Sequence, residues 1–599
     1  MRNIYSPMKS LFYVTLLMLI IIGLPKAQAQ KVGLPVIFLD QSGFYPGLNK
    51  SAVITKDAKG DGFELIAMPA GKSVFTGLLS GWRSTGYSGI KTRIADFSGF
   101  QKSGTYLVRI PGVGDSPVFK IADSVHQDLA LASLKAFYYQ RASLALDKDY
   151  AGKWYRASGH PDTAVLIHPS AATKNRATGS RINVTGGWYD AGDYNKYMVN
   201  SGISTATLLS AYEDFPNYFL GLKAKLPNAK NGVPDILTEA IYNLRWMLKM
   251  QDPYDGGVYN KCTNLGFDAM IMPAQATAPR YVVAKGTAAT LNLVAVAAQA
   301  SRILKDFPRQ YPGLADSCRA AAVLAWNWAL KNPNLAYDQE LMNKTSDLKV
   351  TTGAYGDKDF EDEWSWAAAE LLITTGGSQY YDAFFARLNA MVNLPSWSYV
   401  GILGYYSMIR CHDKLPESYS SITSILKKKV LSIADRYLLT GNAGAYGAVM
   451  GSALPDFVWG SNSVAMNQAV LLINAYLFTQ NKDYLNAAAG NLDYILGRNA
   501  TGYSFVTGIG TKSPMNPHHR ISFADGVMDP IPGMLVGGPN SGKQDGLKYG
   551  AVEPELSYLD DVASYASNEI AINWNAPLVY VANALECLQT KESDGSNNR

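Results

Sequence analysis

The chain has few groups that could cross-link it. Only four cysteines occur among its 599 residues. They show neither a CxxC pair nor the Cys/His spacing of a metal site, and they stand at Cys262, Cys318, Cys411 and Cys587. Two of them, Cys318 and Cys587, fall within helical patterns, where a buried free thiol is the expected state. The fold therefore does not depend on disulfides, which suits a chain long enough to build a large core.

Long apolar runs are missing after the N terminus. The single one spans residues 11–24, follows Arg2 and Lys9, and precedes an Ala-Gln-Ala pattern at residues 27–29. A basic start, an apolar stretch and a small-residue cleavage site are typical of a secretory signal rather than a membrane span. We predict that residues 1–30 are a signal peptide, and that the mature protein is secreted or periplasmic without a membrane span.

An excess of charge of either sign is also missing. The whole chain carries 54 basic and 49 acidic side chains, a formal net charge of +5. The predicted signal peptide contains three of the bases and no acid, so the mature chain keeps 51 bases against 49 acids, a net charge of +2. A nucleic-acid-binding protein concentrates basic residues on one face. The near balance therefore indicates no nucleic-acid partner.

Aromatic residues, in contrast, are abundant. They make up 11% of the chain, with 37 Tyr and 11 Trp, a content that suits carbohydrate stacking and large cores alike. Residues 186–197 combine four aromatic residues, three glycines and the carboxylates of Asp190 and Asp193. Because Gly and Asp favour turns, we expect a loop in which the two carboxylates can converge on one point. Such a pair could hold a water, a cation or a sugar hydroxyl, and a turn with a structural calcium explains this stretch equally well.

Residues 31–122 have the pattern of an all-β domain. Short apolar runs recur between turns rich in Gly, Pro, Asn and Asp. The seven runs are Val36–Leu39, Ser51–Thr55, Phe63–Met68, Val74–Leu79, Arg93–Asp96, Thr105–Ile110 and Val118–Ile121. Seven short strands at this spacing predict an immunoglobulin-like β-sandwich. The segment lacks the paired cysteines of antibody domains and any cluster of ionisable residues that could perform chemistry.

Residues 125–590 have the 3.6-residue period of helices. Twelve helical segments are expected, most of them Ala/Leu-rich and ending near Gly, Asn or Pro. They cover residues 128–147, 199–214, 233–251, 286–304, 315–331, 362–375, 378–391, 398–411, 418–438, 461–480, 482–496 and 575–589. Twelve helices suit a double ring of six inner and six outer helices, an all-α (α/α)6 barrel. We therefore predict a multidomain chain, an all-β sandwich and then this barrel, with a disordered tail at residues 591–599.

Two connections between the helices are too long for simple turns, namely residues 148–198 and 497–574. Long loops inside a compact domain are usually functional or disordered. The first carries the two carboxylates described above, and the second carries His518 and Glu569. Taken alone, Glu569 could simply complement a helix dipole, and His518 could be an ordinary polar loop residue.

Three ordered motifs in these loops point to one family. An Asp-Ala-Gly-Asp motif stands at residues 190–193. A histidine signature fits Ser504, Thr507, Gly510, Lys512, Pro517, His518 and Arg520, and a carboxylate signature fits Tyr558, Asp560, Tyr565, Glu569, Ala571, Asn575 and Ala576. Together they resemble the catalytic parts of glycoside hydrolase family 9, the inverting endoglucanase family also called cellulase family E. The resemblance covers nearly the whole mature chain, and the β segment is similar to the immunoglobulin-like module that many members carry.

The resemblance implies a role for each of these residues. An inverting glycosidase needs an acid on the leaving oxygen and a base that activates water, with the two carboxyl groups about 6.5–9.5 Å apart. The resemblance implies Asp193 as the base, Asp190 as a partner that holds the water, and Glu569 as the acid. The acid must stay protonated near neutral pH, so its pKa should be raised by burial or neighbouring acids. His518 and Arg520 would bind sugar hydroxyls.

Further residues around the site are implied less specifically. Tyr565 would line the cleft next to the scissile bond. Asp560 matches the carboxylate signature, which leaves a catalytic and a structural role both open. Trp397 and Trp459 are candidate sugar platforms, and core packing explains each of them equally well.

The expected chemistry requires no cofactor. Some family members hold a structural zinc through Cys and His near the first helix. Here Ala142 stands where a Cys is expected, and His160 and His168 have no Cys nearby, so we expect no zinc. Calcium could bind in the acidic run 357–363, where hard oxygen ligands concentrate. The resemblance favours Asp362 and Glu363 as its ligands, and a solvated helix start explains the charges as well.

The sequence thus predicts a monomeric glycosidase that cleaves β-1,4-glucosidic bonds inside cellulose or a related β-glucan such as xyloglucan. An exo-acting β-glucosidase or glucosaminidase of the same fold is the nearest alternative, because loop lengths decide between a cleft and a pocket. A non-catalytic glucan-binding protein is a second alternative. The joint presence of Asp190, Asp193 and Glu569 argues against it.

Overall fold

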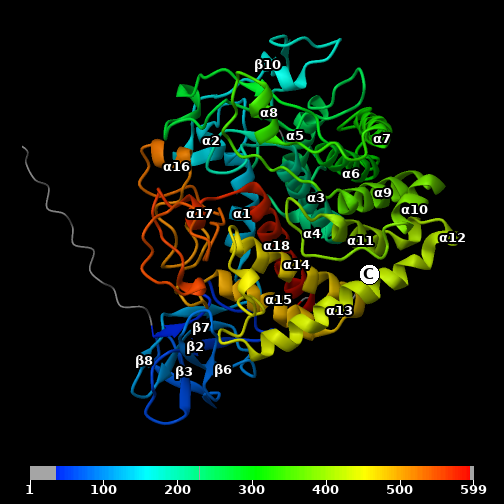
Figure 1. The fold of residues 1–599 in the computed structure, drawn as a ribbon. Coiled ribbons are helices and arrows are strands. Elements are labelled where there is room, and N and C mark those ends of the chain that lie inside the picture. The colour runs from blue at the N-terminus through cyan, green and yellow to red at the C-terminus, as the bar shows by residue number, and fades with distance from the viewer. Residues whose placement is uncertain (1–35, 228, 594–599) are drawn as a thin grey trace, which may run out of the picture. The chain divides into compact units, whose positions relative to one another are not determined.

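The computed structural model describes residues 36–227 and 229–593 (Figure 1). The predicted signal peptide lies outside the described residues, as do residues 594–599 of the predicted tail. In the described part nine strands come first and the long helices follow. This order confirms the prediction of an all-β domain followed by an all-α domain.

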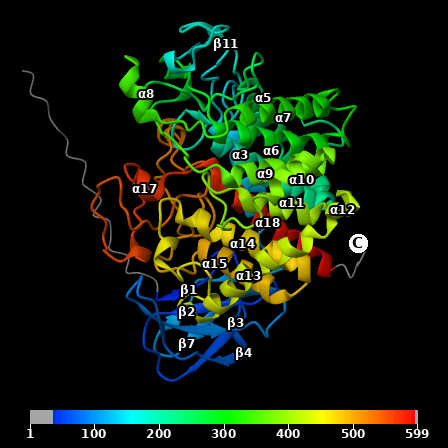
Figure 2. The ribbon, with the colours of Figure 1, turned by 45° about the vertical axis from the view of Figure 1, so that its right-hand side comes forward.

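Two sheets form the N-terminal sandwich, whose strands are drawn in blue in Figure 2. One has the strand order β1-β2-β6-β5 and the other β4-β3-β7-β8, with β9 paired to β7. The strands are β1 (Ile37–Phe38), β2 (Ser51–Ile54), β3 (Gly62–Ala67), β4 (Lys72–Leu78), β5 (Arg83–Ser84), β6 (Lys91–Asp96), β7 (Gly104–Ile110), β8 (Gly114–Asp115) and β9 (Phe119–Ile121). All seven predicted strands are present, and the two additional ones, β5 and β8, are too short for an alternating pattern to predict. The core of the sandwich is aromatic, with Phe44 edge to face with both Phe97 and Phe119.

The described chain then forms twelve helices of eight residues or more, one at each predicted segment. They are α1 (Gln127–Tyr139), α3 (Met198–Asp214), α5 (Asp235–Lys249), α6 (Thr287–Leu304), α7 (Leu314–Lys331), α9 (Glu361–Thr375), α10 (Ser378–Phe385), α11 (Gly401–Arg410), α13 (Ile422–Ala443), α14 (Ser461–Thr479), α15 (Lys482–Ile495) and α18 (Ile572–Ser593). The first helix ends eight residues before the predicted boundary. Arg141 instead lies in a loop, where its backbone forms an isolated β-bridge with Trp188. Its side chain forms a buried ion pair of 2.8 Å with Glu239.

The helices form the two rings of an (α/α)6 barrel. Contacts run from α18 to α3, α6, α9 and α11 in turn, and α14 packs back on α18. Outer helices cover these inner ones, with α7 on α6, α10 on α9 and α15 on α14. Burial separates the rings, because every residue of α6 is buried whereas α7 buries fewer than half of its residues. A helix buried all round belongs inside, and an amphipathic helix covers it.

A small sheet lies among the loops of the helical domain, and no pattern in the sequence predicts it. Its strand order is β11-β10-β14-β13-β12. The strands are β10 (Val165–Ile167), β11 (Arg181–Ile182), β12 (Lys196–Tyr197), β13 (Lys261–Thr263) and β14 (Tyr281–Val282). Strands of two or three residues carry no readable period, which is why they were missed. Because β12 follows residues 190–193 and leads directly into α3, this sheet fixes the position of the Asp-Ala-Gly-Asp turn.

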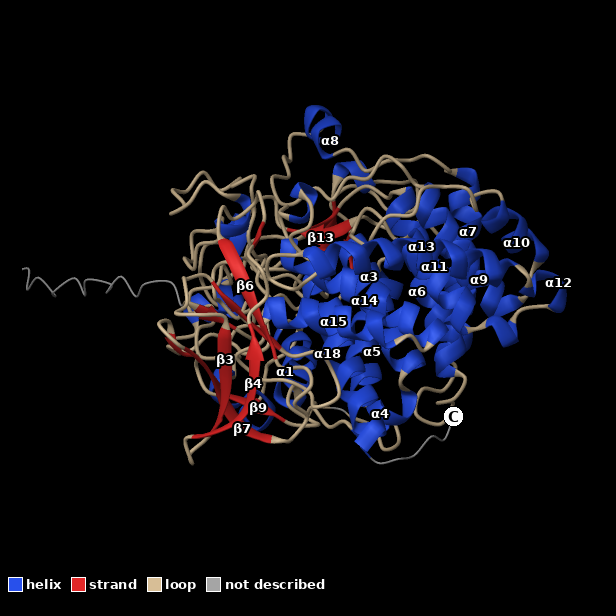
Figure 3. Ribbon diagram, turned by 90° about the horizontal axis from the view of Figure 1, so that it is seen from below, coloured by secondary structure: helices blue, strands red, loops and turns tan. Residues whose placement is uncertain are grey.

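Six short helices complete the loops of the described chain. They are α2 (Lys148–Ala151), α4 (Pro216–Gly221), α8 (Gln339–Thr345), α12 (Glu417–Ser420), α16 (Arg520–Ala524) and α17 (Tyr565–Asn568). In Figure 3 the sandwich strands, in red, gather on one side of the blue helices.

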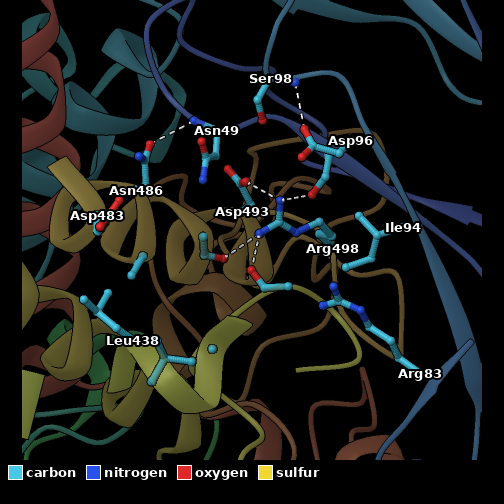
Figure 4. A pocket seen from close by; sticks show the side chains of 16 residues that line it. Asn49, Arg83, Ile94, Asp96, Ser98, Leu438, Asp483, Asn486, Asp493 and Arg498 are labelled. Atoms are coloured by element: carbon cyan, nitrogen blue, oxygen red, sulfur yellow. Dashed lines mark hydrogen bonds and ion pairs between the residues drawn. The ribbon is translucent and has the colours of Figure 1, made fainter. Parts of the chain in front are cut away.

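Buried polar contacts join the sandwich to the barrel. Tyr45 Oη donates to Glu586 Oε1 at 2.7 Å, and the His126 backbone N–H donates to the same oxygen at 2.8 Å. A polar cavity of about 300 Å³ is lined by both domains, and Arg498 and Asp493 form an ion pair of 2.7 Å at its wall (Figure 4). The junction is therefore a specific interface that orders polar groups from both domains.

The cysteines agree with the prediction. All four are buried and none forms a disulfide.

Over the residues that the structure describes, no helix is both long enough and apolar enough to cross a bilayer.

Candidate active site

The turn at residues 190–193 is held by its own backbone and by a neighbouring loop. The Asp190 N–H donates to the Asn195 carbonyl at 3.0 Å. Gly192 makes the closest approach to the next loop, because a Cβ at this position would lie 2.1 Å from the His518 carbonyl oxygen. Only glycine fits there. The glycine of the motif therefore lets the two loops meet.

Segments that are far apart in sequence converge on this turn. His518 and Glu569 form an isolated parallel bridge, and Ala191 forms an antiparallel bridge with Ala571. The Gly192 N–H donates to Glu569 Oε1 at 3.3 Å, across 377 residues of sequence. The three motifs recognised in the sequence thus lie side by side, joined by their backbones.

The two side-chain oxygens of Asp193 differ, because one accepts hydrogen bonds from the protein and the other accepts none. Its Oδ2 accepts from Asn195 Nδ2 at 2.5 Å and from Tyr197 Oη at 3.2 Å. Its Oδ1 is buried and has no hydrogen-bond partner in the protein. A carboxylate with a fixed orientation and one unused oxygen can accept a proton from a water molecule.

Asp190 has a different set of partners. Asn200 Nδ2 donates to its two oxygens at 2.8 and 3.0 Å, and Tyr355 Oη donates to Oδ2 at 3.0 Å. Burial and the neighbouring charge of Asp193 raise the pKa of Asp190 far above its ordinary value. A negative charge on one carboxyl group raises the pKa of a neighbouring one. With its pKa raised to about 8, Asp190 keeps its proton near neutral pH.

Glu569 lies where the short helix α17 ends. Its side chain keeps partial access to solvent, but the protein around the carboxyl desolvates it. This desolvation, with the charges of Asp193 and Asp190, raises the pKa of Glu569 well above its ordinary value. A carboxyl group that stays neutral at pH 7 can act as a proton donor.

His518 is held in one tautomer. Its Nδ1 lies 2.6 Å from the Val562 carbonyl oxygen, which can only accept, so Nδ1 carries the hydrogen. Burial lowers the pKa of His518, so the ring is neutral and its Nε2 is an acceptor. A hydroxyl group is a suitable donor to that nitrogen.

Arg520 is buried and bound to the backbone of two loops. Its Nη1 donates to the Gly192 carbonyl at 2.8 Å, and its Nε donates to the Asp268 carbonyl at 2.9 Å. Its charge also favours the ionised form of Glu569, against the effect of burial. Arg520 therefore ties the 190–193 turn to the loop after β13, in addition to any contact with a ligand.

Each of the three aromatic candidates, Tyr565, Trp459 and Trp397, packs against another aromatic ring. Tyr565 and Trp459 have ring centroids 5.5 Å apart, and Trp459 is 42% exposed. Trp397 meets Tyr355 edge to face at 5.3 Å and is half-buried. Both tryptophans are thus next to residues of the site, and both also pack against protein.

The carboxylate of Asp560 accepts hydrogen bonds from other residues of the 497–574 connection. Its oxygens accept from the backbone N–H groups of Met515 and Asn516, both at 2.9 Å, and from Asn568 Nδ2 at 3.1 Å. These contacts link the segment just before His518 to Asn568, the residue before Glu569. This geometry favours the structural role that the sequence left open over a catalytic one.

The sequence did not single out the residues that orient the two aspartates. Asn195 and Tyr197 lie in the same aromatic run as Asp193, two and four residues after it. This spacing allows a contact with Asp193 but is not specific enough to predict one. Asn200 lies in the first turn of α3, and no sequence pattern around it indicates a role in the site. Tyr355 is contributed from 165 residues away, with a left-handed φ of 46°, and no local pattern predicts that contact.

The acidic run at the start of α9 has unsatisfied oxygens. Glu363 is fully buried, and neither of its carboxylate oxygens has a hydrogen-bond partner in the protein. One oxygen of Asp357 is also buried without a partner. Burial, with the charges of Asp362 and Asp357, raises the pKa of Glu363 well above its ordinary value.

These residues fit a hard cation such as calcium, which takes carboxylate, carbonyl and water oxygens. Among residues 36–227 and 229–593, however, no group of three His, Cys, Asp or Glu side chains is gathered closely enough to form a metal site by itself. Backbone or water ligands would have to complete the shell. At the position considered for zinc, His160 Nδ1 is 2.8 Å from Tyr189 Oη, and His168 Nε2 is 2.9 Å from the Leu348 carbonyl.

A glycoside hydrolase needs a general acid and a general base. A carboxyl group with a raised pKa and an oriented aspartate, both on loops of an (α/α)6 barrel, fit these two roles. Comparison with known proteins identifies the family. Residues 126–582 match the model of glycosyl hydrolase family 9, and residues 34–115 match that of the cellulase N-terminal ig-like domain. The chain belongs to glycosyl hydrolase family 9, which confirms the resemblance seen in the sequence.

Individual relatives agree over nearly the full length. The chain is 43% identical over 553 residues to the xyloglucan-specific endo-beta-1,4-glucanase BoGH9A of Bacteroides ovatus, covering 92% of this chain and 94% of that protein. It is 32% identical over 555 residues to endoglucanase D of Acetivibrio thermocellus, covering 91% and 82%.

Solved structures confirm the fold. The structure of Bacteroides ovatus GH9 superimposes with a TM-score of 0.88 at 41% identity, over 93% of this chain and 99% of that one. AaCel9A in complex with cellobiose-like isofagomine superimposes with a TM-score of 0.82 at 29% identity, over 92% and 99%.

Proposed function

We propose that the chain is an inverting endo-β-1,4-glucanase. The observation that carries the proposal is the meeting of two differently surrounded carboxyl groups, Asp193 and Glu569, across one backbone junction. Asp193 presents a bare oxygen, and Glu569, next to Gly192, has a strongly raised pKa. An inverting glycosidase needs a base and an acid at the same time.

In the proposed reaction Glu569 donates its proton to the oxygen of the leaving sugar. Asp193 Oδ1 accepts a proton from a water molecule as that water attacks the anomeric carbon from the opposite face. Asp190, in its neutral form, holds this water without competing for the proton. His518 Nε2 and Arg520 bind hydroxyl groups of the sugar and orient it for attack.

We infer a β-1,4-linked glucan backbone as the substrate, with xyloglucan ahead of unbranched cellulose. The support for xyloglucan is the relative of 43% identity, whose name states that specificity. Support for cleavage inside the chain comes from the same name and from the endoglucanase at 32% identity. We also keep the prediction that residues 1–30 direct export, and that the enzyme acts as a monomer outside the cytoplasm.

Product profiles on xyloglucan, carboxymethyl-cellulose and cellohexaose test this proposal. An endo-acting enzyme lowers the viscosity of its polymer early and releases a mixture of oligosaccharides, with the fastest rate on xyloglucan. Release of a single sugar or disaccharide at constant viscosity would identify the exo-acting alternative. Binding without any release, unchanged in Glu569→Gln, would identify a glucan-binding protein and contradict the proposal.

We further propose that a calcium ion binds at the start of α9, with Asp362 and Glu363 as side-chain ligands and with backbone or water oxygens completing its shell. The support is the buried, unsatisfied carboxylate oxygens at the start of α9. An ion there would neutralise acids that burial otherwise drives to their protonated forms. Its role would be structural, because α9 belongs to the inner ring of helices and the ion takes no part in the reaction above.

A further inference from the structure

Lys261, on β13, is a buried cation that the mechanism above does not use. The side chain is fully buried. Its Nζ donates to Gln339 Oε1 at 2.7 Å, to Thr352 Oγ1 at 3.0 Å and to the Gly353 carbonyl at 2.6 Å. All three ammonium hydrogens are thus used on neutral acceptors. An ammonium group buried without a carboxylate partner is costly, so its presence requires an explanation.

One of these hydrogen bonds begins a chain that ends on the base. Thr352 Oγ1 lies 2.7 Å from Thr263 Oγ1. Thr263 Oγ1 lies 2.9 Å from Asn195 Oδ1, and Asn195 Nδ2 lies 2.5 Å from Asp193 Oδ2. Four hydrogen bonds therefore connect the ammonium group of Lys261 to the carboxylate of Asp193.

The ends of the chain fix the direction of every link. The ammonium group can only donate and the carboxylate can only accept. The Thr263 hydroxyl has two acceptors that cannot donate, Asn195 Oδ1 at 2.9 Å and the Asn264 carbonyl at 2.8 Å, which share its single hydrogen. Thr263 therefore takes its own hydrogen bond from Thr352. All four donors therefore point from Lys261 towards Asp193. Hydrogen bonds aligned in this way polarise one another, and the polarisation favours negative charge at the accepting end.

We propose that Lys261 is a positioning residue that keeps Asp193 ionised and correctly oriented through the chain Thr352, Thr263 and Asn195. This inference rests on the proposed function, because it assigns Asp193 as the general base. The pairing of β12 with β13 makes it possible, since Tyr197 lies opposite Lys261 in that register. Tyr197, the second donor to Asp193 Oδ2, also lies with its ring 5.4 Å from Lys261 Nζ.

The hydrogen bonds to the Asp193 carboxylate come from Asn195 and Tyr197, and not from another charged group. Asp190 on the same turn, Asp268 after β13 and Glu569 at the end of α17 are acids, so none of them can supply a positive charge. Arg520 is a second cation near the site, but its Nη1 and Nε donate to backbone carbonyls and not to the Asp193 carboxylate.

The remaining titratable neighbours of Asp193 are neutral. Burial raises the pKa of Tyr197 and of Tyr355 well above the ordinary value and lowers that of His518. Burial also lowers the pKa of Lys261 to about 7, against the opposing effect of Asp193. Lys261 is therefore charged in the acidic range where the base would otherwise take up a proton.

The pH dependence of kcat/KM tests the proposal. In Lys261→Met the acidic limb of the profile should move to higher pH by about half a unit or more, because the base is protonated more readily without the cation. Thr263→Val breaks the chain but keeps the charge and the volume, and should move the limb in the same direction. Thr263→Ser keeps the hydroxyl and should leave the limb at its wild-type position.

Lys50→Met is the matched control for removal of a buried lysine. Lys50 is also fully buried, and its Nζ donates to the backbone carbonyls of Pro46 and Leu48, both at 2.7 Å, inside the sandwich. Its loss should lower the melting temperature without moving the acidic limb. A folded Lys261→Met enzyme with the wild-type limb would overturn the proposal. If that variant does not fold, coincident profiles of Thr263→Val and Thr263→Ser overturn it instead.

A measurement without turnover separates this inference from the proposed function. Carbon-13 NMR of protein labelled at aspartate Cγ, compared with Asp193→Asn, follows the protonation of Asp193 directly. Lys261→Met should protonate this carboxylate at higher pH than the wild type does. Inactive wild-type protein would contradict the proposed function, whereas an unchanged NMR titration would contradict only the role of Lys261.

Discussion

At the scale of single residues, the two aspartates of the 190–193 turn differ in what surrounds them. Asp190 receives three hydrogen bonds, whereas Asp193 keeps one oxygen without any partner in the protein. Sequence spacing alone could place both carboxylates on one loop but could not distinguish them. The distinction depends on Tyr355 and Asn200, which come from other elements. The chemical assignment of base and partner therefore follows from tertiary contacts.

Glu569→Gln should lower kcat on an unactivated glucan by about 10²–10⁴-fold, because an amide keeps the shape of the side chain but cannot donate the proton. Folding should be retained, as measured by circular dichroism. A substrate with an activated leaving group, such as an aryl glycoside, needs less protonation and should lose less activity. Near wild-type turnover on natural glucan would remove Glu569 from the role of acid.

Activity should also fall at high pH for a defined reason. The pKa of Glu569 is raised by burial and by two neighbouring acids, so the group is protonated, and active as an acid, below that raised value. As pH rises through it, the proton donor is lost and kcat should decrease. An aryl glycoside substrate should show a weaker decrease at the same pH. Identical basic limbs for the two substrates would argue against this assignment.

At the scale of elements, the regular parts of the fold were predictable and the irregular parts were not. All twelve long helices and seven strands followed from hydrophobic period and turn residues, because each buries a continuous face. The loop sheet β10–β14 was missed, since its strands are too short to have a period. Within that sheet, β13 carries Lys261 and pairs with β12, the strand that follows Asp193. Sequence motifs thus identified the candidate site, but not the scaffold that orients it.

The start of α9 gives a prediction for calcium. If an ion neutralises Glu363, calcium should raise the melting temperature of the wild-type protein and EGTA should lower it. Glu363→Gln removes a ligand and should abolish most of this calcium-dependent shift. Glu361, on the same turn of the helix and exposed, provides the control variant Glu361→Gln. Equal calcium shifts in both variants would show that the ion binds elsewhere.

At the scale of the whole molecule, the sandwich contributes no catalytic candidate but shares a buried interface with the barrel. Phe38, Val53 and Ile94 of the sandwich form one apolar cluster with Tyr446 and Ala500 of the barrel. Deletion of residues 31–121 would expose this surface. We expect a lower melting temperature for the isolated barrel, with every catalytic group still present. An unchanged melting temperature would contradict the packing role.

The same interface should make stability depend on pH. Burial alone would lower the pKa of His126, but the charge and hydrogen bond of Asp40 outweigh it and raise the pKa above 6.5. A raised histidine pKa adds stability that is complete below pH 6.5 and is lost as pH rises through the folded value. The melting temperature should therefore fall as pH rises above about 6.5, and His126→Gln should flatten this slope. An equal slope in the variant would remove His126 from this role.

The stereochemistry of the first product tests the central assignment most directly. If Asp193 activates water and no glycosyl–enzyme intermediate forms, hydrolysis of a β-linked glucan yields the α-anomer first. Proton NMR in the first minutes, before mutarotation, distinguishes the two anomers. Asp193→Ala should abolish this reaction, and Asp190→Ala should slow it less severely while keeping the α-product. Early appearance of the β-anomer would contradict the inverting mechanism and the role of Asp193 as its base.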